Sequence, residues 1–325
     1  MPTPAAVTSH GGSGTFPRMK SGLIGRACGL AVAALLMGAA PVLAEDTAAS
    51  TAWPVPKLSL MSDEDSVYAP PGDPREQSGV NKGGVNFALD IWYSTDYVFR
   101  GIDRSEVGGH EDAPNAQFDS SLNFNLGKLP HPFIGVFVNV YNSDPVSRFQ
   151  EIRPYFGVDW TIRPINIQLG NNTYIYPERE ETNTSEVFGK LTFDDSFIFG
   201  TEAPVFRPYI YGAYDYDLYN GGYFEIGVSH DFVWEDWGLT LTPIARLSFV
   251  TTNQLFALHP NGNDSGFQHY DIGFMVQYSL NKLVGIPDRF GAWSLQGEMF
   301  YTDNIHNDLR ADTQTWGGIG IGFRY

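Results

Sequence analysis

From position 85 to the end of the chain, apolar and polar residues alternate in runs of about ten residues. Clusters of Gly, Pro, Asn and Asp separate the runs. In the first run, Phe87, Leu89 and Ile91 fall on one face of a strand. Asn86 and Asp90 fall on the other face. A period of two limits the chain to an antiparallel β architecture, either a sandwich or a barrel.

Apolar runs long enough for a membrane helix are absent after the N-terminal region. A spanning helix needs about 20 consecutive apolar residues, whereas the hydrophobic fraction of the 325 residues is 42% and the mean hydropathy is -0.20. A transmembrane barrel fits this composition, because its strands alternate lipid-facing apolar residues with polar residues that face the lumen. The aromatic content of 14% fits the interfacial girdles of such barrels and would fit a large sandwich equally.

The N-terminal region has the organisation of a secretory signal. Residues 1–18 are interpreted as an upstream extension. Residues 19–44 are the predicted signal peptide, with a basic part, an apolar part and a cleavage site after Ala44. Residues 45–84 are rich in Pro, Ser, Ala and acidic residues without a sustained period, which predicts a periplasmic linker. The alternative is that this segment enters the barrel as a plug.

The alternation predicts about twelve strands in residues 85–325, an even number, as in single-chain bacterial barrels. With both ends of this unit on the periplasmic side, every second connection is expected to be long and extracellular, and the others short. Two connections expected to be short, 194–203 and 281–291, are longer than this rule predicts. The predicted strands are 85–100, 116–126, 132–141, 150–162, 164–176, 184–193, 204–216, 222–232, 239–250, 268–280, 292–303 and 314–325.

The last predicted strand carries the most specific local signal. Ile319, Ile321, Phe323 and Tyr325 alternate with glycines and Arg324, and the strand ends on an aromatic residue. This pattern resembles the C-terminal strand that the barrel-assembly machinery of the outer membrane recognises. We therefore expect Ile321, Phe323 and Tyr325 to form an assembly signal. The expected fold is all-β, an antiparallel transmembrane barrel surrounded by the lipid of the bacterial outer membrane.

The polar face of the strands would line the lumen. Acidic residues outnumber basic ones there, so a hydrated lumen would favour cations, whereas a narrow lumen would force the charges into ion pairs. We predict a porin-like channel for small hydrophilic solutes with a mild preference for cations. One alternative is a closed barrel with a structural or surface-binding role, and another is an outer-membrane lipid hydrolase. The candidate pore-lining residues are Asp90, Asp96, Arg100, Asp119, Glu151, Arg153, Asp159, Arg207, Glu225, Asp231, Arg246, Asp271 and Glu298.

Charge and cysteine content argue against several classes of function. The formal net charge of -17 and the pI near 4.6 are unfavourable for nucleic-acid partners, whose phosphates require Lys and Arg. The single cysteine, Cys28, lies inside the predicted signal peptide, so the mature chain would have no disulfide, thiolate metal site or cysteine nucleophile. The sequence contains no zinc motif, phosphate-binding loop or dinucleotide fingerprint, and we expect neither a cofactor nor a bound metal.

The first run contains a motif of a known family. The segment from Leu89 to Glu106 resembles the opening strand of TorF-type porins, in which a sequence such as S-D-Y-x-F-R-G is followed by a short polar stretch. Here residues 94–101 read STDYVFRG, with Thr95 inserted after the serine. The resemblance implies an outer-membrane barrel with a pore function.

The period of two also places the residues of this motif on a strand. Tyr97 and Phe99 are expected on the apolar face, and Asp96 and Arg100 on the polar face. Arg100 would lie at the extracellular end, where we expect it to pair with Asp96 and order the first loop. Gly101 would permit a tight exit from the strand.

Two local patterns bear on an enzymatic role. Residues 143–148, SDPVSR, are similar to a stretch near the active site of outer-membrane phospholipases, which place a His-x-Ser pair just upstream. Phe137 and Asn139 occupy those positions here and can neither accept a proton nor attack an ester. His269 and Asp271 share a strand face without a visible third partner, so we interpret them as a structural hydrogen bond. The chain is therefore predicted not to be an enzyme.

Overall fold

The computed structural model describes residues 84–105, 114–141, 149–177, 180–252, 255–258 and 265–325. The upstream extension, the signal peptide with its cleavage site at Ala44 and the linker up to residue 83 lie outside the described residues, so they stay predictions. The same holds for residues 143–148, which carry the stretch similar to phospholipases.

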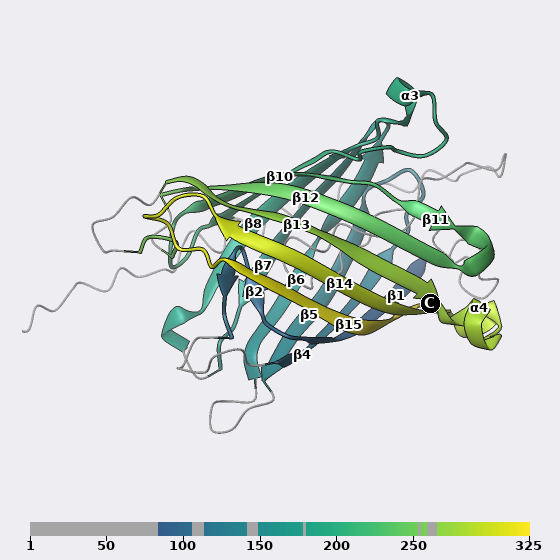
Figure 1. Cartoon of the computed structure of the whole chain (residues 1–325), viewed down its shortest axis with the longest axis horizontal. Coiled ribbons are helices and arrows are strands. Elements are labelled where there is room, and N and C mark those ends of the chain that lie inside the picture. Colours follow the sequence, from purple (N-terminus) through teal and green to yellow (C-terminus); the bar gives the residue numbers. More distant parts are fainter. Residues whose placement is uncertain (1–83, 106–113, 142–148, 178–179, 253–254, 259–264) are drawn as a thin grey trace, which may run out of the picture. The chain divides into compact units, whose positions relative to one another are not determined.

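The described residues form a closed antiparallel barrel of twelve strands (Figure 1). Strands that follow one another along the chain are neighbours in the ring. The first and last strands, β1 and β15, pair with Asp90 opposite Gly322, and β10 pairs with β12. The short strand β11 continues the line of β10 along β12. The barrel strands are β1 (Val85–Ser94), β4 (Asn115–Phe124), β5 (His131–Tyr141), β6 (Phe149–Ile162), β7 (Ile165–Tyr174), β8 (Thr184–Phe193), β9 (Tyr209–Asp215), β10 (Gly222–Ser229) with β11 (Phe232–Trp234), β12 (Leu239–Thr251), β13 (Gly266–Ser279), β14 (Ala292–Asn304) and β15 (Gln314–Arg324).

The strand count and the fold class predicted from the sequence are confirmed, and most strand boundaries agree within a few residues. Two boundaries differ. The first strand ends at Ser94, not at Arg100, because the chain turns into the lumen at Thr95 and Asp96. Strand β9 begins at Tyr209, five residues after its predicted start at 204, because the residues before it belong to a folded connection.

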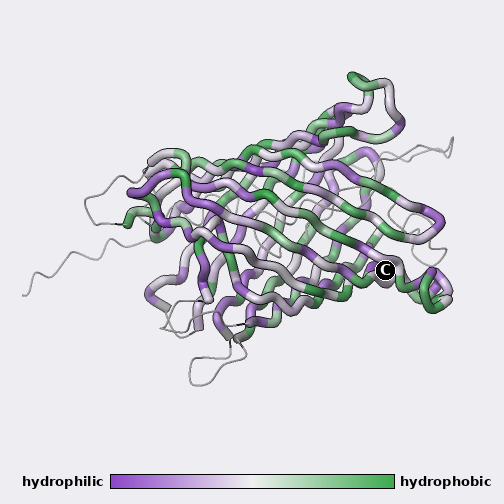
Figure 2. The backbone as a smooth tube through the Cα atoms, viewed as in Figure 1, coloured by the Kyte–Doolittle hydropathy of each residue, from purple (hydrophilic) through white to green (hydrophobic). Residues whose placement is uncertain are grey.

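Hydrophobic and hydrophilic residues alternate along the strands (Figure 2). The exposed large side chains of the strands are apolar, and the buried side chains are largely polar. Ile134, Leu169 and Ile272 are more than half exposed on the outer surface, whereas Glu151 and Arg153 are fully buried inside. Each strand of the closed ring is paired on both sides, so its backbone needs no water, and exposed apolar side chains on such a ring face membrane hydrocarbon. The protein is therefore a transmembrane barrel of the bacterial outer-membrane type.

The two ends of the barrel differ. One end, called the terminal end below, holds both ends of the barrel unit, where the Phe87 amide donates to the Tyr325 carbonyl at 2.8 Å. Its connections carry α3 (Ser196–Phe199), η3 (Glu235–Trp237), α4 (Leu280–Val284) and η4 (Asp288–Phe290). The opposite end, called the loop end, carries the connection from β1 to β4 and η2 (Glu180–Thr182). In the described part of the chain, no helix combines the length and the apolar composition needed to span a membrane.

Candidate functional site

After β1 the chain does not leave the barrel as an external loop but folds into its interior. The Ser94 hydroxyl donates to the Asp96 carbonyl at 2.8 Å, and the Thr95 amide donates to the Gly317 carbonyl at 2.9 Å, so the turn is fixed against β15. The strands β2 (Val98–Phe99) and β3 (Ile102–Asp103) then form a hairpin, closed by a bond from the Arg104 amide to the Tyr97 carbonyl at 2.8 Å. Residues 97–104 are called the inner hairpin below.

The turn of the inner hairpin has the backbone conformation that a two-residue hairpin loop needs. Arg100 and Gly101 both have positive φ, 52° and 73°, which is the signature of a type I′ turn. Glycine adopts this conformation without strain, and arginine does so at a cost. The R-G pair of the motif therefore forms the tip of a hairpin and not the exit of a membrane strand.

The tip of the inner hairpin lies against β13 and the last connection at the loop end. A Cβ on Gly101 would lie 2.5 Å from His269 Nδ1, so only glycine fits there. Gln268 Nε2 donates to the Arg100 carbonyl at 2.9 Å, and the Asp312 amide donates to the Gly101 carbonyl at 2.7 Å. The tip is thereby held on the side of the barrel formed by β13.

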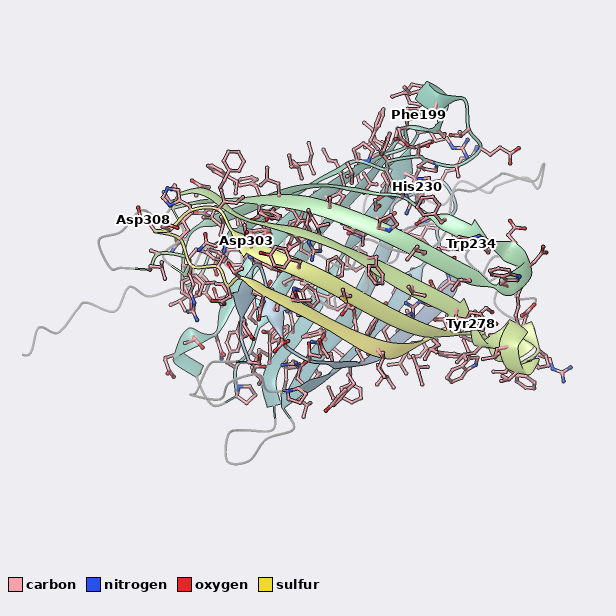
Figure 3. The ribbon with its side chains drawn as sticks, in the orientation of Figure 1. Phe199, His230, Trp234, Tyr278, Asp303 and Asp308 are labelled. Atoms are coloured by element: carbon pink, nitrogen blue, oxygen red, sulfur yellow. The ribbon has the colours of Figure 1, made fainter. Side chains whose placement is uncertain are left out.

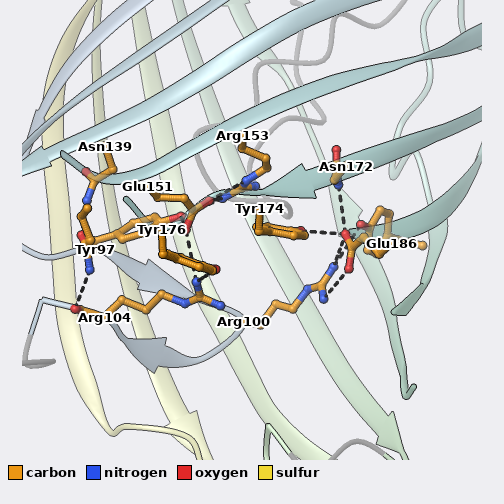
Figure 4. Close-up of polar contacts among 12 residues, drawn as sticks. Tyr97, Arg100, Arg104, Asn139, Glu151, Arg153, Asn172, Tyr174, Tyr176 and Glu186 are labelled. Atoms are coloured by element: carbon orange, nitrogen blue, oxygen red, sulfur yellow. Dashed lines mark hydrogen bonds and ion pairs between the residues drawn. The ribbon is translucent and has the colours of Figure 1, made fainter. Parts of the chain in front are cut away.

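An ion pair holds the hairpin to the other side of the barrel. The guanidinium of Arg100 donates through Nη1 and Nη2 to the two carboxylate oxygens of Glu186 on β8, both at 3.0 Å (Figure 4). Glu186 also accepts from the Tyr174 hydroxyl at 2.7 Å and from Asn172 Nδ2 at 3.0 Å. Because Arg100 and Glu186 are both buried, each charge depends on the other for compensation.

A second carboxylate, Glu151 on β6, organises the base of the hairpin (Figure 4). It accepts from Arg153 Nε at 2.7 Å, from Arg104 Nη1 at 3.1 Å and from the Tyr97 hydroxyl at 3.1 Å. Arg104 also donates to the Tyr176 hydroxyl. Burial raises the pKa of Tyr97 well above its ordinary value, so this hydroxyl keeps its proton and acts as a donor at neutral pH.

Aromatic rings surround these cations. The Arg104 guanidinium carbon lies 4.0 Å from the centre of the Phe99 ring, and that of Arg153 lies 4.8 Å from the centre of the Phe137 ring. Contacts of this kind compensate part of the cost of removing a guanidinium from water. The hairpin therefore packs as a mixed aromatic and ionic cluster, and it contacts β6, β8 and β13 together.

Eleven of the thirteen residues predicted to line the lumen are buried, and the structure brings several of them together; Arg207 and Asp231, which lie outside the strands at the terminal end, are partly exposed. Arg100, Glu151 and Arg153 meet at the inner hairpin, and Asp96 lies buried at its entrance. Arg246 Nε donates to Asp271 at 2.9 Å. The remaining candidates lie apart from the hairpin. Three of them form ion pairs at the terminal end, Arg207 with Asp231 and Asp90 with Arg324. The others form hydrogen bonds or are buried: Asp119 with Tyr155, Asp159 with Asn166, Glu225 with Tyr223, and Glu298 on β14.

Two expectations for the motif were wrong. Tyr97 and Phe99 were expected on the lipid face and are instead buried inside the barrel, 1% and 2% exposed. Arg100 was expected at the extracellular end of the first strand and instead lies at the tip of the inner hairpin, where it pairs with Glu186. The common cause is the turn at Thr95. Alternate residues can be assigned to the lipid and lumen faces only while the chain continues as a barrel strand.

Sequence reasoning also missed residues that complete the site. Arg104 lies three residues beyond the motif, and Tyr174 and Tyr176 lie at the end of β7 on the same face as Asn172. Two tyrosines placed two residues apart at a strand end, on its polar face, were a visible signal for inward hydrogen-bonding groups. Arg104 and its partner Tyr176 lie 72 residues apart along the chain, and nothing in a single sequence links them.

The third partner of His269 and Asp271 is present in the structure. Ser248 Oγ lies 2.7 Å from His269 Nδ1, and His269 Nε2 lies 3.1 Å from Asp271 Oδ2. Ser248 occupies an irregularity in the pairing of β12 with β13, and its hydroxyl also bonds the amide and the carbonyl of His269. All three side chains are at most 2% exposed. The Ser248 hydroxyl thus supplies hydrogen bonds to the backbone of His269 at the irregularity, and the cluster is closed to solvent.

The half of the lumen nearer the terminal end has a different character. Asn86 lies opposite Asn123, and Gln277 lies opposite Gln296, and these four inward side chains are partly exposed. At the loop end, by contrast, Phe256 and Leu309 are fully buried in the same apolar cluster as Ile102 of the hairpin. The terminal half therefore presents partly exposed polar side chains, while the hairpin packs into a buried apolar cluster at the loop end. Among the described residues, no group of three or more His, Cys, Asp or Glu side chains is arranged to hold a metal ion.

Comparison with known proteins gives likeness of fold only. No protein-family model matches the sequence, and no curated protein matches it. Among solved structures, the NanC porin has 12% identity and a TM-score of 0.44, covering 72% of this chain and 98% of its own. An outer membrane channel from Pseudomonas putida has 7% identity and a TM-score of 0.39, covering 79% and 100%. LpxR from Salmonella typhimurium has 11% identity and a TM-score of 0.40, covering 73% and 99%. At such scores the likenesses say nothing about the activity of this chain.

Proposed function

We propose that this protein is an outer-membrane channel for small hydrophilic solutes, in which the inner hairpin forms the constriction. The observation that carries the proposal is the contrast between the two halves of the lumen. Partly exposed amide side chains such as Asn86 and Gln296 line the terminal half, and a charged hairpin crosses the other half. A lumen lined by amides and carboxylates holds water, and a charged constriction selects which solutes pass.

The proposed channel has its terminal end in the periplasm and its loop end outside the cell. Barrels of this class have short periplasmic turns and longer extracellular loops. The resemblance of residues 94–101 to TorF-type porins supports the proposal, and the hairpin gives that motif a physical role. Membership of that family is part of the proposal.

A mild preference for cations belongs to the same proposal. Among the described residues, buried Asp and Glu side chains outnumber buried Lys and Arg side chains. Arg100, Arg153 and Arg246 are compensated by carboxylates, so the excess acid gives the lumen a negative field. A negative field raises the local concentration of cations and lowers that of anions.

A second candidate is a barrel closed by its own hairpin, with a structural or surface-binding role. The tight burial of Phe99 and Arg100 and the cover formed by Phe256 and Leu309 favour it. The two candidates share the fold and differ in whether ions pass. An enzymatic role has less support, because the Ser248 hydroxyl is buried and used by the backbone of His269.

Planar-bilayer recordings of the refolded full chain distinguish the candidates. The channel predicts discrete conductance steps and a reversal potential of cation sign in a salt gradient. The matched variant replaces residues 97–104 with a Gly and Ser linker of equal length, and it should conduct more than the wild type. A silent wild type with a conducting variant would favour the closed barrel. Silence of both, when both show heat-modifiable folding, would refute the channel.

A further inference from the structure

The connection between β8 and β9, residues 194–208, is unusually apolar for a turn at the terminal end. It carries α3, and Phe197, Ile198, Phe199 and Phe206 are each at least half exposed. Figure 3 shows Phe199 at the tip of this connection, which stands beyond the ends of its two strands. Large apolar side chains gathered on one exposed connection indicate a surface that is covered in the working protein.

The connection is ordered by its own polar contacts, so the exposure of these side chains is built into its structure. The carboxylate of Asp195 accepts from the Val205 amide at 2.7 Å and from the Phe206 amide at 2.8 Å, which ties the two halves of the connection together. The Thr201 amide donates to the Ser196 carbonyl at 3.0 Å. These contacts fold the connection on itself and leave its large apolar side chains exposed.

The apolar tip is continuous with the lipid-facing surface of the barrel. Phe193, on the outward face of β8, packs edge-on against Phe197 with ring centres 5.7 Å apart. Phe199 and Phe206 make a similar contact at 5.5 Å. On the next strand Ile210 also faces outward and is more than half exposed. An unbroken apolar surface therefore runs from the membrane-facing wall onto the connection.

Two other connections at the terminal end share this character. Trp237 in η3 is 64% exposed, and Val284 in α4 is 65% exposed. Phe290 in η4 is also more than half exposed, with the guanidinium of Arg289 over its ring at 4.9 Å. These three connections follow β8, β11 and β13, so they are spread along the rim and do not form one compact patch. A protein partner would need one compact patch, whereas a lipid bilayer surrounds the barrel and can contact apolar side chains at several places along the rim.

We infer that residues 194–208, together with the connections that carry Trp237 and Val284, lie in the interfacial layer of the membrane leaflet at the terminal end. The occupant of this surface is phospholipid. Aromatic and aliphatic side chains are stable at the boundary between headgroups and acyl chains, and a tryptophan ring suits the same layer. The connections would fix the depth and tilt of the barrel in the leaflet. This inference depends on the barrel spanning a membrane and is independent of whether the lumen conducts.

Site-directed fluorescence in vesicles tests the inference. The full chain, with Cys28→Ser to remove its own cysteine, is given Ile198→Cys and labelled with an environment-sensitive dye. The matched control is Asn220→Cys, an exposed residue in the connection from β9 to β10 at the opposite end. Both proteins are refolded into phosphatidylcholine vesicles, with and without lipids that carry a nitroxide near the headgroup, and folding is confirmed by heat-modifiability.

The expected result is a blue-shifted emission at position 198 that nitroxide lipids quench and that high salt does not change, with neither effect at position 220. Phe206→Cys repeats the measurement if labelling at 198 prevents folding. Water-like emission at positions 198 and 206 would overturn the inference. A blue-shifted emission that nitroxide lipids do not quench would also overturn it, because the cover would then be protein, either a second copy or a bound partner.

Discussion

Arg100 at the tip of the inner hairpin and Glu186 on β8 form a two-point ion pair across the interior of the barrel, with both N to O distances 3.0 Å. The two residues lie 86 positions apart in the chain. This pair links the first connection at the loop end to the opposite wall. Loss of this contact should therefore most directly change the position of the inner hairpin in the lumen.

Replacement of Arg100 by alanine should loosen the hairpin. The Glu186 carboxylate would stay buried and would still accept from Tyr174 and Asn172, but removing one partner of a buried ion pair costs about 3 to 5 kcal/mol. We expect a higher single-channel conductance or a new protease-sensitive site, with the barrel still folded. Arg289→Ala, which removes an exposed arginine at the terminal end, should leave both readouts unchanged. Unaltered conductance and protease resistance in Arg100→Ala would contradict the assignment.

Replacement of Gly101 by alanine should displace the hairpin tip. The new Cβ would need a positive φ of 73° and would lie 2.5 Å from His269 Nδ1. Gly127 is a matched control, since its φ is 70° and a Cβ there would meet no atom within 4 Å. Gly127→Ala should cost only the backbone strain, roughly 1–2 kcal/mol, while Gly101→Ala should lower the unfolding midpoint further. Equal midpoints for the two variants would show that the tip does not pack on β13.

Alkaline pH should destabilise the base of the hairpin. Burial raises the pKa of Tyr97 above the ordinary value of 10.0, so the unfolded chain loses this proton at a lower pH than the folded chain. The contribution to stability is therefore fully present below pH 10.0 and falls as the pH rises above it. The unfolding midpoint, followed by heat-modifiability, should decline above this pH, and the decline should be shallower in Tyr97→Phe. An identical slope in the variant would exclude Tyr97 as the titrating group.

Replacement of Ser248 by alanine should affect stability and not hydrolysis. The Ser248 hydroxyl bonds the His269 amide at 3.2 Å and the His269 carbonyl at 3.1 Å, and leaving buried polar groups without a partner costs about 1–3 kcal/mol each. A lower unfolding midpoint is expected, with no ester or phospholipid hydrolysis by either protein. Hydrolysis by the wild type that disappears in Ser248→Ala would establish an enzyme instead.

The face assignments succeeded where strands are regular. Asp119, Glu151 and Arg153 were placed inside from the period of two alone, and Ile321 on β15 is correctly outside. The period works because successive side chains of a strand alternate between lipid and lumen. It failed at Tyr97 and Phe99, since a chain that turns inward keeps its alternation while both of its faces become buried.

The sequence by itself determined the twelve strands and the faces of their residues, because these depend on neighbours along the chain and on the contrast between lipid and water. Only the tertiary structure decided what fills the lumen. The inner hairpin and the partners of Arg100 and Glu151 depend on contacts between distant segments, in which burial makes each charge seek a specific counter-charge. A period of two describes a strand and contains no information about such pairs.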